Sequence, residues 1–386
     1  MKMKKLIAMF ICLFACCLFL ASCEEPIGDY LKDYDYKPEP VYSVMYDFYI
    51  IAEDGTDSMA KSTVNEKINQ VFGDKYNTKL NMIFLSEADY ENQLKVDLGL
   101  ATIDGYNKTV TNLPAGYTYG GRIVLINDAT MLNYLGDKLV DLNPYLDTPD
   151  FGTLNTQINA PLLSAADVDG KKLAIPNNRV YGEYEYICIN RDIAETQLNF
   201  SALSELLEIK SMEDAAEIIA AYGGNVSDIV RVVNGQYDLK AKIENQEYAG
   251  FTDSRWICNV MTYPTATLEV AYASAYGIIP EADLIVKNDD GEDVVAVDYT
   301  YRAMDVVYSF NHEEEMRNLL CYGVPNTNYR LSEDKFVTRL TEQGSNYIIN
   351  LNYCGDIFKA YYSAEWTKDM AESGKNQVKE AVLSEE

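Results

Sequence analysis

The stretch Ile123-Val124-Leu125-Ile126 decides the fold, because it is apolar on both of the faces that a strand presents. Such a run is typical of a strand in the middle of a parallel sheet, where helices cover both sides. Working outward, the neighbouring sequence predicts strands and helices in alternation: strands at 41–52 and 80–85, and helices from Ser58 to Gly73, from Ser86 to Leu98 and from Met131 to Leu139.

The second half of the chain shows the same alternation less regularly. Strands that alternate with helices predict an α/β fold with a parallel or mixed sheet and ligand sites at the carboxyl ends of the strands. The length of 386 residues exceeds what one core usually supports, so two lobes are expected. The elements predicted here are strands at 172–175, 184–190, 256–263 and 271–278, helices at 201–208, 211–221, 299–310 and 312–321, and a hairpin turn at 289–291.

The first 22 residues are predicted to be a secretory signal peptide. Three lysines in MKMKK precede 16 uninterrupted apolar or small residues, a run too short for a comfortable transmembrane helix. The following Leu20-Ala21-Ser22-Cys23 resembles the bacterial lipobox, which implies cleavage before Cys23 and attachment of a diacylglycerol to its thiol. The alternative is an ordinary signal peptide with an incidental cysteine.

Charge excludes one class of partner. The 60 acidic residues against 32 basic ones give a net charge of −28, so the chain repels phosphate backbones and is not expected to bind nucleic acid. Residues 23–40 are acidic and rich in proline, and they predict a flexible linker. The membrane is therefore expected to be reached through the lipid on Cys23 only, and the folded part is expected to start near Val41.

The cysteines and the single histidine limit the chemistry. His312 is the only histidine, and the acidic residues after it predict the first turn of a surface helix rather than an acid–base catalyst. The aspartate-rich segments 167–170 and 289–293 lack the register of a calcium loop and predict turns. No metal, cofactor or catalytic residue is expected. Buried thiols and one or two disulfides are both compatible with the remaining cysteines, whose spacing fits no zinc site: Cys188, Cys258, Cys321 and Cys354.

Several short segments occur in an order that resembles one protein family. They are GRIVLIN at 121–127, LVDLNPYL at 139–146, DGKKLAIPN at 169–177, YEYICINRD at 184–192, and the segments 299–310 and 314–323. In this order they are similar to the bacterial extracellular solute-binding lipoproteins of family 1, which serve ABC importers, typically for sugars. The likeness covers most of residues 41–380. The chain departs from the family in a short middle helical region and in an insert at Tyr106–Gly120.

The resemblance implies a two-lobed, periplasmic-binding-protein-like (type II) fold, with hinge strands and an interlobe cleft that closes over a ligand. It assigns residues 41–172 and 278–322 to the first lobe and residues 173–277 and 323–386 to the second, with crossings near 172–178, 264–277 and 322–329. It also implies a monomer on the extracytoplasmic face of the cell membrane. Such a protein binds an oligosaccharide or a similar solute and delivers it to ABC permease subunits.

Tyrosine is used heavily, with 31 residues against 12 phenylalanines. Flat apolar rings stack on the C–H faces of sugars, and hydroxyl, amide and carboxylate groups bond the sugar hydroxyls. The densest cluster of these residue types lies at 177–186, where the resemblance places the first hinge and the cleft floor. The ligand-binding candidates there are Asn178, Tyr181, Glu183 and Tyr184. The alternative is that the tyrosines pack a sheet face as ordinary strand residues.

Four further residues are candidates outside that cluster. Trp256 and Trp366 are the only tryptophans and are candidate stacking platforms, with core packing as the alternative. Asn127 and Asp128 follow the apolar strand, at a carboxyl end where side chains can bond ligand hydroxyls. A helix N-cap is the alternative for Asp128. Glu53 and Asp54, after the first strand, are of the same kind.

Two other functions are compatible with the composition. A secreted carbohydrate-active hydrolase that uses paired carboxylates needs neither histidine nor metal. A structural surface lipoprotein would have a cleft without a ligand. The lobe-crossing motifs favour the receptor, because a hydrolase would not share them. We therefore predict a non-enzymatic solute-binding receptor.

Overall fold

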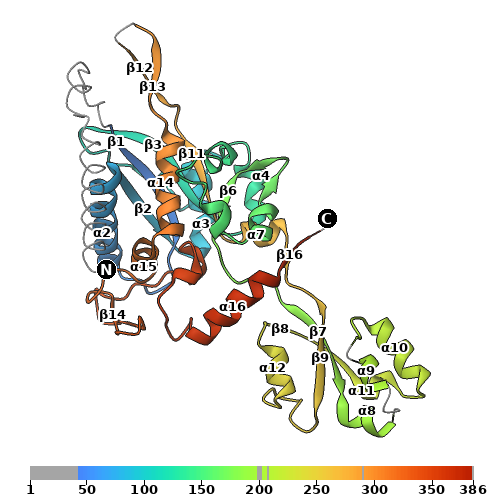
Figure 1. The fold of residues 1–386 in the computed structure, drawn as a ribbon. Helices are drawn as coiled ribbons and strands as arrows, with labels where there is room; N and C mark the ends of the chain where they lie inside the picture. The colour runs from blue at the N-terminus through green and yellow to red at the C-terminus, as the bar shows by residue number, and fades with distance from the viewer. Residues whose placement is uncertain (1–41, 198–201, 207, 289–290, 385–386) are drawn as a thin grey trace, which may run out of the picture. The chain divides into compact units, whose positions relative to one another are not determined.

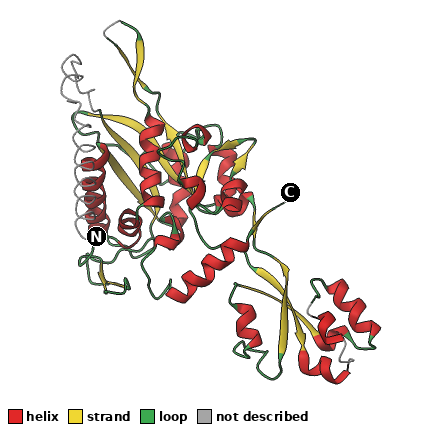
Figure 2. Cartoon of the chain, in the orientation of Figure 1, coloured by secondary structure: helices red, strands yellow, loops and turns green. Residues whose placement is uncertain are grey.

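The computed structural model describes residues 42–197, 202–206, 208–288 and 291–384, which Figures 1 and 2 show as ribbons. The predictions for the signal segment 1–22 and for the linker 23–40, including the lipid on Cys23, lie outside the described residues and stay predictions. From Tyr42 onward the chain forms one compact unit. Within the described residues, no helix combines the length and the apolarity that crossing a bilayer needs.

The largest sheet has five strands, in the order β2 (Thr78–Leu85), β1 (Ser43–Ile51), β3 (Tyr117–Ile126), β11 (Ala275–Pro280) and β6 (Ala174–Pro176). β1 pairs in parallel with β2 and β3, whereas β11 pairs antiparallel with β3 and β6. The sheet is therefore mixed. The stretch from Ile123 to Ile126 is the end of the central strand, and its four side chains are fully buried, as its two-sided apolar character predicts.

Helices cover this sheet and share one large core cluster with it. α2 (Ser58–Tyr76) places an apolar stripe against the sheet, as predicted, but it does not end at Gly73. Asn77 ends it instead, because its left-handed backbone (φ 52°) lets its N–H donate to the carbonyl of Gly73. The other helices of this cluster are α3 (Glu87–Asp97), α4 (Leu132–Leu135), α5 (Asn143–Leu146), α6 (Leu154–Gln157), α7 (Ala160–Ala165), α13 (Leu268–Tyr272), α14 (Tyr299–His312), α15 (Glu314–Tyr322) and α16 (Lys368–Glu380).

A second sheet is antiparallel, with strands in the order β8 (Val230–Gly235), β7 (Tyr184–Asn190) and β9 (Trp256–Thr262). Side chains alternate along β7, so each face of the sheet has a small core of its own. Ile187 and Ile189 face one core, and Tyr186 and Cys188 face the other. The first core is shared with α8 (Arg191–Gln197), α9 (Ala202–Leu206), α10 (Met212–Ala221) and α11 (Val226–Ile229), and the second with α12 (Leu239–Glu244).

The chain passes from the first sheet to the second between Pro176 and Tyr184, and it returns between Thr262 and Ala275. Residues 322–329 connect α15 to a hairpin made of β14 (Tyr329–Leu331) and β15 (Val337–Arg339). The assignment of residue ranges to two lobes stays a prediction. The remaining elements are β10 (Thr265–Ala266), paired with β16 (Val382–Leu383), and the short helices η1 (Ala129–Met131), η2 (Leu351–Tyr353) and η3 (Ile357–Lys359).

Two predicted elements differ from the structure. The helix expected to reach Leu139 ends with α4 at Leu135, and the N–H of Val140 instead donates to the carbonyl of Ile278 in β11. The strand expected at 271–278 begins only at Ala275. The residues before it form α13, because Thr267 caps that helix by accepting a hydrogen bond from the N–H of Val270 at 3.3 Å.

His312 is also placed differently from the prediction. It is the last residue of α14, and α15 begins after it at Glu314. The imidazole stacks on the ring of Tyr308, with centroids 4.7 Å apart. Burial and the charge of Lys359 lower the pKa of His312. It ends α14, against Tyr308, rather than starting a surface helix.

The first of the two aspartate-rich segments forms the predicted turn. At 167–170 the N–H of Gly170 donates to Asp167 Oδ1 at 2.7 Å, closing the predicted turn between β4 (Asp167–Val168) and β5 (Lys171–Lys172). Asp289 and Asp290 lie outside the described residues, between β12 (Leu284–Lys287) and β13 (Asp293–Val297). Across the described ranges, no group of three His, Cys, Asp or Glu side chains is placed to hold a metal ion.

The insert at Tyr106–Gly120 includes the first residues of β3. Two buried carboxylates hold it, Asp47 in β1 and Asp97 at the end of α3. Thr111 and Tyr119 donate hydroxyl hydrogen bonds of 2.8 Å to Asp47, and Thr109 donates one of 2.7 Å to Asp97. The insert is therefore fixed by hydrogen bonds, as a covering of the sheet.

Candidate ligand-binding site

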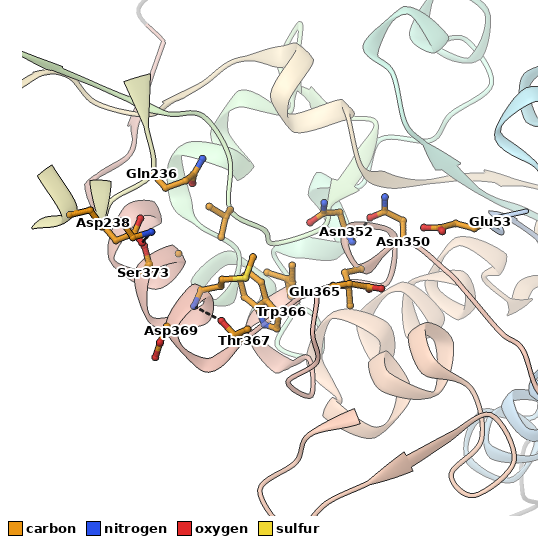
Figure 3. A pocket seen from close by; sticks show the side chains of 16 residues that line it. Glu53, Gln236, Asp238, Asn350, Asn352, Glu365, Trp366, Thr367, Asp369 and Ser373 are labelled. Atoms are coloured by element: carbon orange, nitrogen blue, oxygen red, sulfur yellow. Dashed lines mark hydrogen bonds and ion pairs between the residues drawn. The ribbon is translucent and has the colours of Figure 1, made fainter. Parts of the chain in front are cut away.

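A pocket of about 740 Å³ lies beyond the end of β1 (Figure 3). Its volume falls within the range of small-molecule sites. Three segments far apart in the sequence form its walls: residues 350–357, the turn between β8 and α12, and residues 365–374 at the start of α16. Most of the side chains that line it end in amide, hydroxyl or carboxylate groups.

Glu53, Asn350 and Asn352 form the first wall. Glu53 follows β1, and Asn350 caps η2 by accepting a hydrogen bond from the N–H of Asn352 at 2.9 Å. Within the described residues, the Asn352 amide and the Glu53 carboxylate have no hydrogen bond or ion pair of their own. Both groups are therefore free to bond a ligand.

Gln236, Asp238 and Lys242 form the second wall. The turn after β8 carries the first two, and the last turn of α12 carries the exposed Lys242. Lys242 Nζ lies 2.6 Å from Asp238 Oδ2, so these two charges neutralise each other. The Gln236 amide has no hydrogen bond in the part of the chain that the structure describes. It points into the pocket in Figure 3.

The third wall is the start of α16 and the loop before it. Thr367 caps the helix by accepting a hydrogen bond from the N–H of Met370 at 3.2 Å, and Asp369 and Ser373 lie on the helix face toward the pocket. Trp366 is only 5% exposed and packs on Phe358, with ring centroids 6.1 Å apart. Its indole nitrogen is buried and has no hydrogen-bond partner among the described residues.

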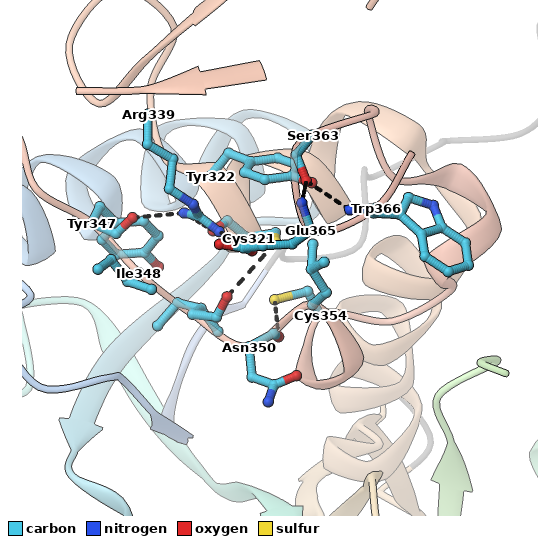
Figure 4. A network of polar contacts seen from close by, with 12 residues as sticks. Cys321, Tyr322, Arg339, Tyr347, Ile348, Asn350, Cys354, Ser363, Glu365 and Trp366 are labelled. Carbon is cyan, nitrogen blue, oxygen red and sulfur yellow. Dashed lines mark hydrogen bonds and ion pairs between the residues drawn. The ribbon is translucent and has the colours of Figure 1, made fainter. Parts of the chain in front are cut away.

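A buried polar network supports the first wall (Figure 4). Arg317 is fully buried, and its Nη2 donates to the carbonyl of Leu351 at 2.9 Å. Arg339 donates to the carbonyl of Tyr347 at 2.8 Å, and its other amino group lies 3.8 Å from the carboxylate of Glu365 in the pocket. The network thus joins two of the three walls.

Two cysteines lie between these guanidinium groups. Burial alone would raise the pKa of Cys321, but a hydrogen bond with Cys354 and the charges of Arg317 and Arg339 lower it to about 6. Burial and the neighbouring Cys321 raise the pKa of Cys354. Cys321 Sγ also faces the carbonyl of Ile349 at 4.0 Å, and Cys354 Sγ donates to the carbonyl of Asn350 at 3.4 Å.

The same wall is tied to the segment that leads to the second sheet. Asn177 and Ser274 donate hydrogen bonds of 3.3 and 2.6 Å to the carbonyl of Asn352. Asn178 donates to Asp356 Oδ1 at 3.1 Å, and burial raises the pKa of that carboxyl group to about 6. The passage between the sheets and the pocket wall are therefore one hydrogen-bonded unit.

Of the predicted site residues, Trp366 lines the pocket and Asn127 lies near the first wall. Asn127 donates a hydrogen bond of 2.7 Å to Glu87 at the carboxyl end of the sheet. Burial and Glu87 raise the pKa of the nearby Tyr353, while a hydrogen bond with Asn127 opposes the rise. Asp128 caps η1 by accepting a hydrogen bond from the N–H of Thr130 at 2.7 Å, which was its alternative role.

Of the segment 178–184, Val180 lines the pocket, but the four candidates of that segment do not. Asn178, Tyr181 and Tyr184 are buried and use their polar groups internally: Tyr181 donates to Asn159 at 2.6 Å and Tyr184 to Glu380 at 2.8 Å. Glu183 is exposed, without a side-chain partner in the described ranges.

Trp256 lies in the small core beside α12. It packs against Phe251, at 4.7 Å between centroids, and under the guanidinium of Arg231. Its surroundings are those of a core side chain.

Sequence reasoning missed the asparagines of the first wall and the glutamine of the second. The signal was present at Asn350-Leu351-Asn352, where two amides alternate with an apolar residue directly after the apolar pair Ile348-Ile349. No sequence pattern marked Gln236 as a site residue. It lies in the pocket because the turn after β8 and the start of α16, far apart in the sequence, both line it. Chemically, the site offers planar hydrogen-bonding groups beside an aromatic ring, and it holds more carboxylates than cations.

Comparison with known proteins identifies the fold. No protein-family model matches the chain, and no curated protein is similar to it in sequence. Among solved structures, the N-glycan transport solute-binding protein NgtS from Streptococcus pneumoniae superposes with a TM-score of 0.50 at 13% sequence identity, over 88% of this chain and 84% of that one. The chain has the fold of a solute-binding protein.

The NgtS complex with Man5GlcNAc gives the same TM-score of 0.50 at 13% identity, over 88% of this chain and 83% of NgtS. The predicted periplasmic-binding-protein-like fold is therefore confirmed. Both structures are of the same solute-binding protein, without and with its glycan.

Proposed function

We propose that this protein is the sugar-binding receptor of an ABC importer, held on the extracytoplasmic face of the cell membrane by a lipid on Cys23. The observation that carries the proposal is the pocket, where the amides of Asn352 and Gln236 and the carboxylate of Glu53 have no partner of their own among the described residues. Sugar hydroxyls both donate and accept in a plane, so amides and carboxylates suit them. The glycan complex of a protein with the same fold supports this reading.

The ligand that we propose is a neutral oligosaccharide. The carboxylates of Glu53, Glu365 and Asp369 line the pocket, and its one lysine is paired with Asp238. An anionic sugar would therefore meet net repulsion. The receptor binds its ligand without converting it, as a monomer, and passes it to permease subunits.

The experiment is a calorimetric titration of the protein with Man5GlcNAc and shorter neutral glycans, followed by analysis of the glycan for product. We expect binding without cleavage. Glu53→Gln keeps the shape of the side chain but loses a charge-assisted hydrogen bond, so we expect affinity to fall about tenfold or more. Glu183→Gln is the matched control and should leave affinity unchanged.

Asn352→Ala and Asn107→Ala form a second matched pair, since Asn107 is exposed and distant from the lining. If Glu183→Gln weakens binding and Glu53→Gln does not, the ligand lies on the segment 178–184 instead. A hydrolysed glycan would reject the receptor in favour of the hydrolase. Binding of none of the glycans, peptides or polyamines in a thermal-shift screen would favour a structural lipoprotein.

The anchor has an independent test. Cys23→Ala removes the proposed attachment point, so labelled fatty acid should no longer enter the protein. Equal labelling of the wild type and the variant would reject the anchor without affecting the ligand proposal.

A further inference from the structure

The four cysteines of the described chain form two pairs, and all four are buried free thiols in the structure. Cys188 in β7 lies directly opposite Cys258 in β9, in register on adjacent antiparallel strands. Their sulfur atoms are 2.7 Å apart, closer than two sulfur atoms settle without a bond between them. Directly opposed residues of an antiparallel pair have a Cβ separation that a disulfide can span.

We propose that Cys188 and Cys258 form a disulfide when the protein folds outside the cytoplasm, and that Cys321 and Cys354 remain reduced. The surroundings of the two pairs decide this difference. Cys188 and Cys258 lie in an apolar core with Tyr186, Phe251 and Trp256, and they are uncharged as thiols. Conversion of two neutral thiols to a neutral disulfide leaves no buried charge without a partner.

The other pair is held differently. Cys321 Sγ donates to the carbonyl of Ile349 at 4.0 Å and Cys354 Sγ to the carbonyl of Asn350 at 3.4 Å, so each buried thiol has an acceptor of its own. A disulfide between Cys321 and Cys354 would remove both of these donors from a buried site. The reduced form is therefore favoured at this pair.

The reaction requires a disulfide donor, such as the oxidised form of an extracytoplasmic thiol oxidoreductase. One cysteine loses its proton and attacks a sulfur of the donor, which releases one donor thiolate and leaves a mixed disulfide. The second cysteine, also deprotonated, attacks the protein sulfur of that bond and releases the second donor thiolate. Because both cysteines are fully buried in the fold, exchange takes place before α12 covers them.

The bond would close a loop between residues 70 positions apart, which contains α8 to α12 and β8. It joins the strand by which the chain enters the second sheet to the strand by which it leaves. Gln236, Asp238 and Lys242 lie inside this loop, so the bond would also hold the second wall of the pocket. This last consequence rests on the proposed function.

Trypsin separates the four cysteines onto different peptides: 180–191, 256–287, 318–330 and 340–359. The full chain is exported in a bacterial host, quenched with N-ethylmaleimide under denaturing conditions and digested without reductant. We expect peptides 180–191 and 256–287 to appear as one linked species, lighter than the sum of the two by the two hydrogen atoms that oxidation removes. Peptides 318–330 and 340–359 should carry the alkyl group.

Recovery of peptides 180–191 and 256–287 as separate alkylated peptides would overturn the proposal, as would a link that includes Cys321 or Cys354. This measurement needs neither a ligand nor a variant. Thermal unfolding gives a second test: reductant should lower the melting temperature of the wild type and leave that of C188A/C258A unchanged. Unchanged glycan affinity after reduction would reject only the effect on the pocket, and the absence of any glycan binding would reject the proposed function while the disulfide stands.

Discussion

The first wall of the pocket, with Asn350 and Asn352, packs beside the large core of the five-stranded sheet. The second wall, with Gln236 and Asp238, is a turn beside the small core that α12 shares with the three-stranded sheet. The first wall is tied to its surroundings by Arg317, Asn177 and Ser274. Among the described residues, α16 reaches the second wall by one hydrogen bond, from the N–H of Tyr237 to Gln377.

The difference indicates how the site is divided. Local stability follows the number of buried contacts and satisfied hydrogen bonds, so the first wall is the fixed reference and the second wall is the part that adapts. In a receptor whose lobes close on a ligand, the second wall would then be the one that moves. The variants below test each side of this comparison.

The largest effect is expected at Arg317. Arg317→Leu removes the donor to the carbonyl of Leu351 and the buried positive charge that lowers the pKa of Cys321, so we expect the free energy of unfolding to fall by about 3–5 kcal/mol. Arg231→Leu is the matched variant in the small sheet. Arg231 is exposed and lies over the ring of Trp256, at 5.0 Å from the centroid, so its loss should cost only about 1 kcal/mol.

Urea unfolding of the two variants measures both values. If Arg231→Leu costs as much as Arg317→Leu, the second wall is as firmly held as the first and the comparison fails. Glycan affinity should follow the same order, because Arg317 orients the residues between Asn350 and Asn352.

A pH effect of intermediate size is expected at the first wall only. The pKa of Cys321 is about 6 in the fold, below its ordinary value of 9.0. An acidic group with a lowered folded pKa stabilises the fold above its unfolded pKa and loses this contribution as pH falls through the folded value. The free energy of unfolding should therefore rise between about pH 6 and pH 9, by an amount on the order of a few kcal/mol.

Cys321→Ser removes the ionisation and should flatten this rise, as urea titrations at several pH values will show. Below pH 6 a second slope of opposite sign is expected. Burial raises the pKa of Asp356 to about 6, so its contribution is full below pH 4 and is lost as pH rises through 6. Asp356→Asn should remove that slope and leave the rise above pH 6 in place.

The sequence predicted the five-stranded sheet and its covering helices better than it predicted the residues of the pocket. The two-sided apolar run at 123–126 placed the central strand, and the stripe of α2 placed a covering helix, because burial is written directly into hydrophobic periodicity. Helix ends were less certain. Gly73 is tolerated inside α2, and the cap at Thr267 converted part of an expected strand to α13.

The pocket depends on contacts between segments far apart in the sequence, and hydrophobic periodicity does not predict such contacts. Asn352 and Gln236 meet because η2 and the turn after β8 come to the same pocket from positions more than a hundred residues apart. The cluster at 177–186 has the residue types of a sugar site, but Asn178 and Tyr181 bond Asp356 and Asn159 instead. Residue type alone does not distinguish a side chain that contacts a ligand from one that forms a hydrogen bond within the protein.

The smallest effect is optical and compares the two tryptophans. Trp366 lines the pocket and Trp256 lies in the small core, so a bound glycan should change the emission of Trp366 alone. We expect the spectral response of the wild type to persist in Trp256→Phe and to disappear in Trp366→Phe. Each substitution keeps an aromatic ring in place and should cost about 1 kcal/mol of stability.

A fluorescence titration with the glycan that calorimetry selects measures the response. The affinity of Trp366→Phe is checked by calorimetry, so that loss of signal is not mistaken for loss of binding. A response that disappears in Trp256→Phe would mean that the ligand alters the core of the second sheet, and the small core would then belong to the binding reaction as much as the pocket does.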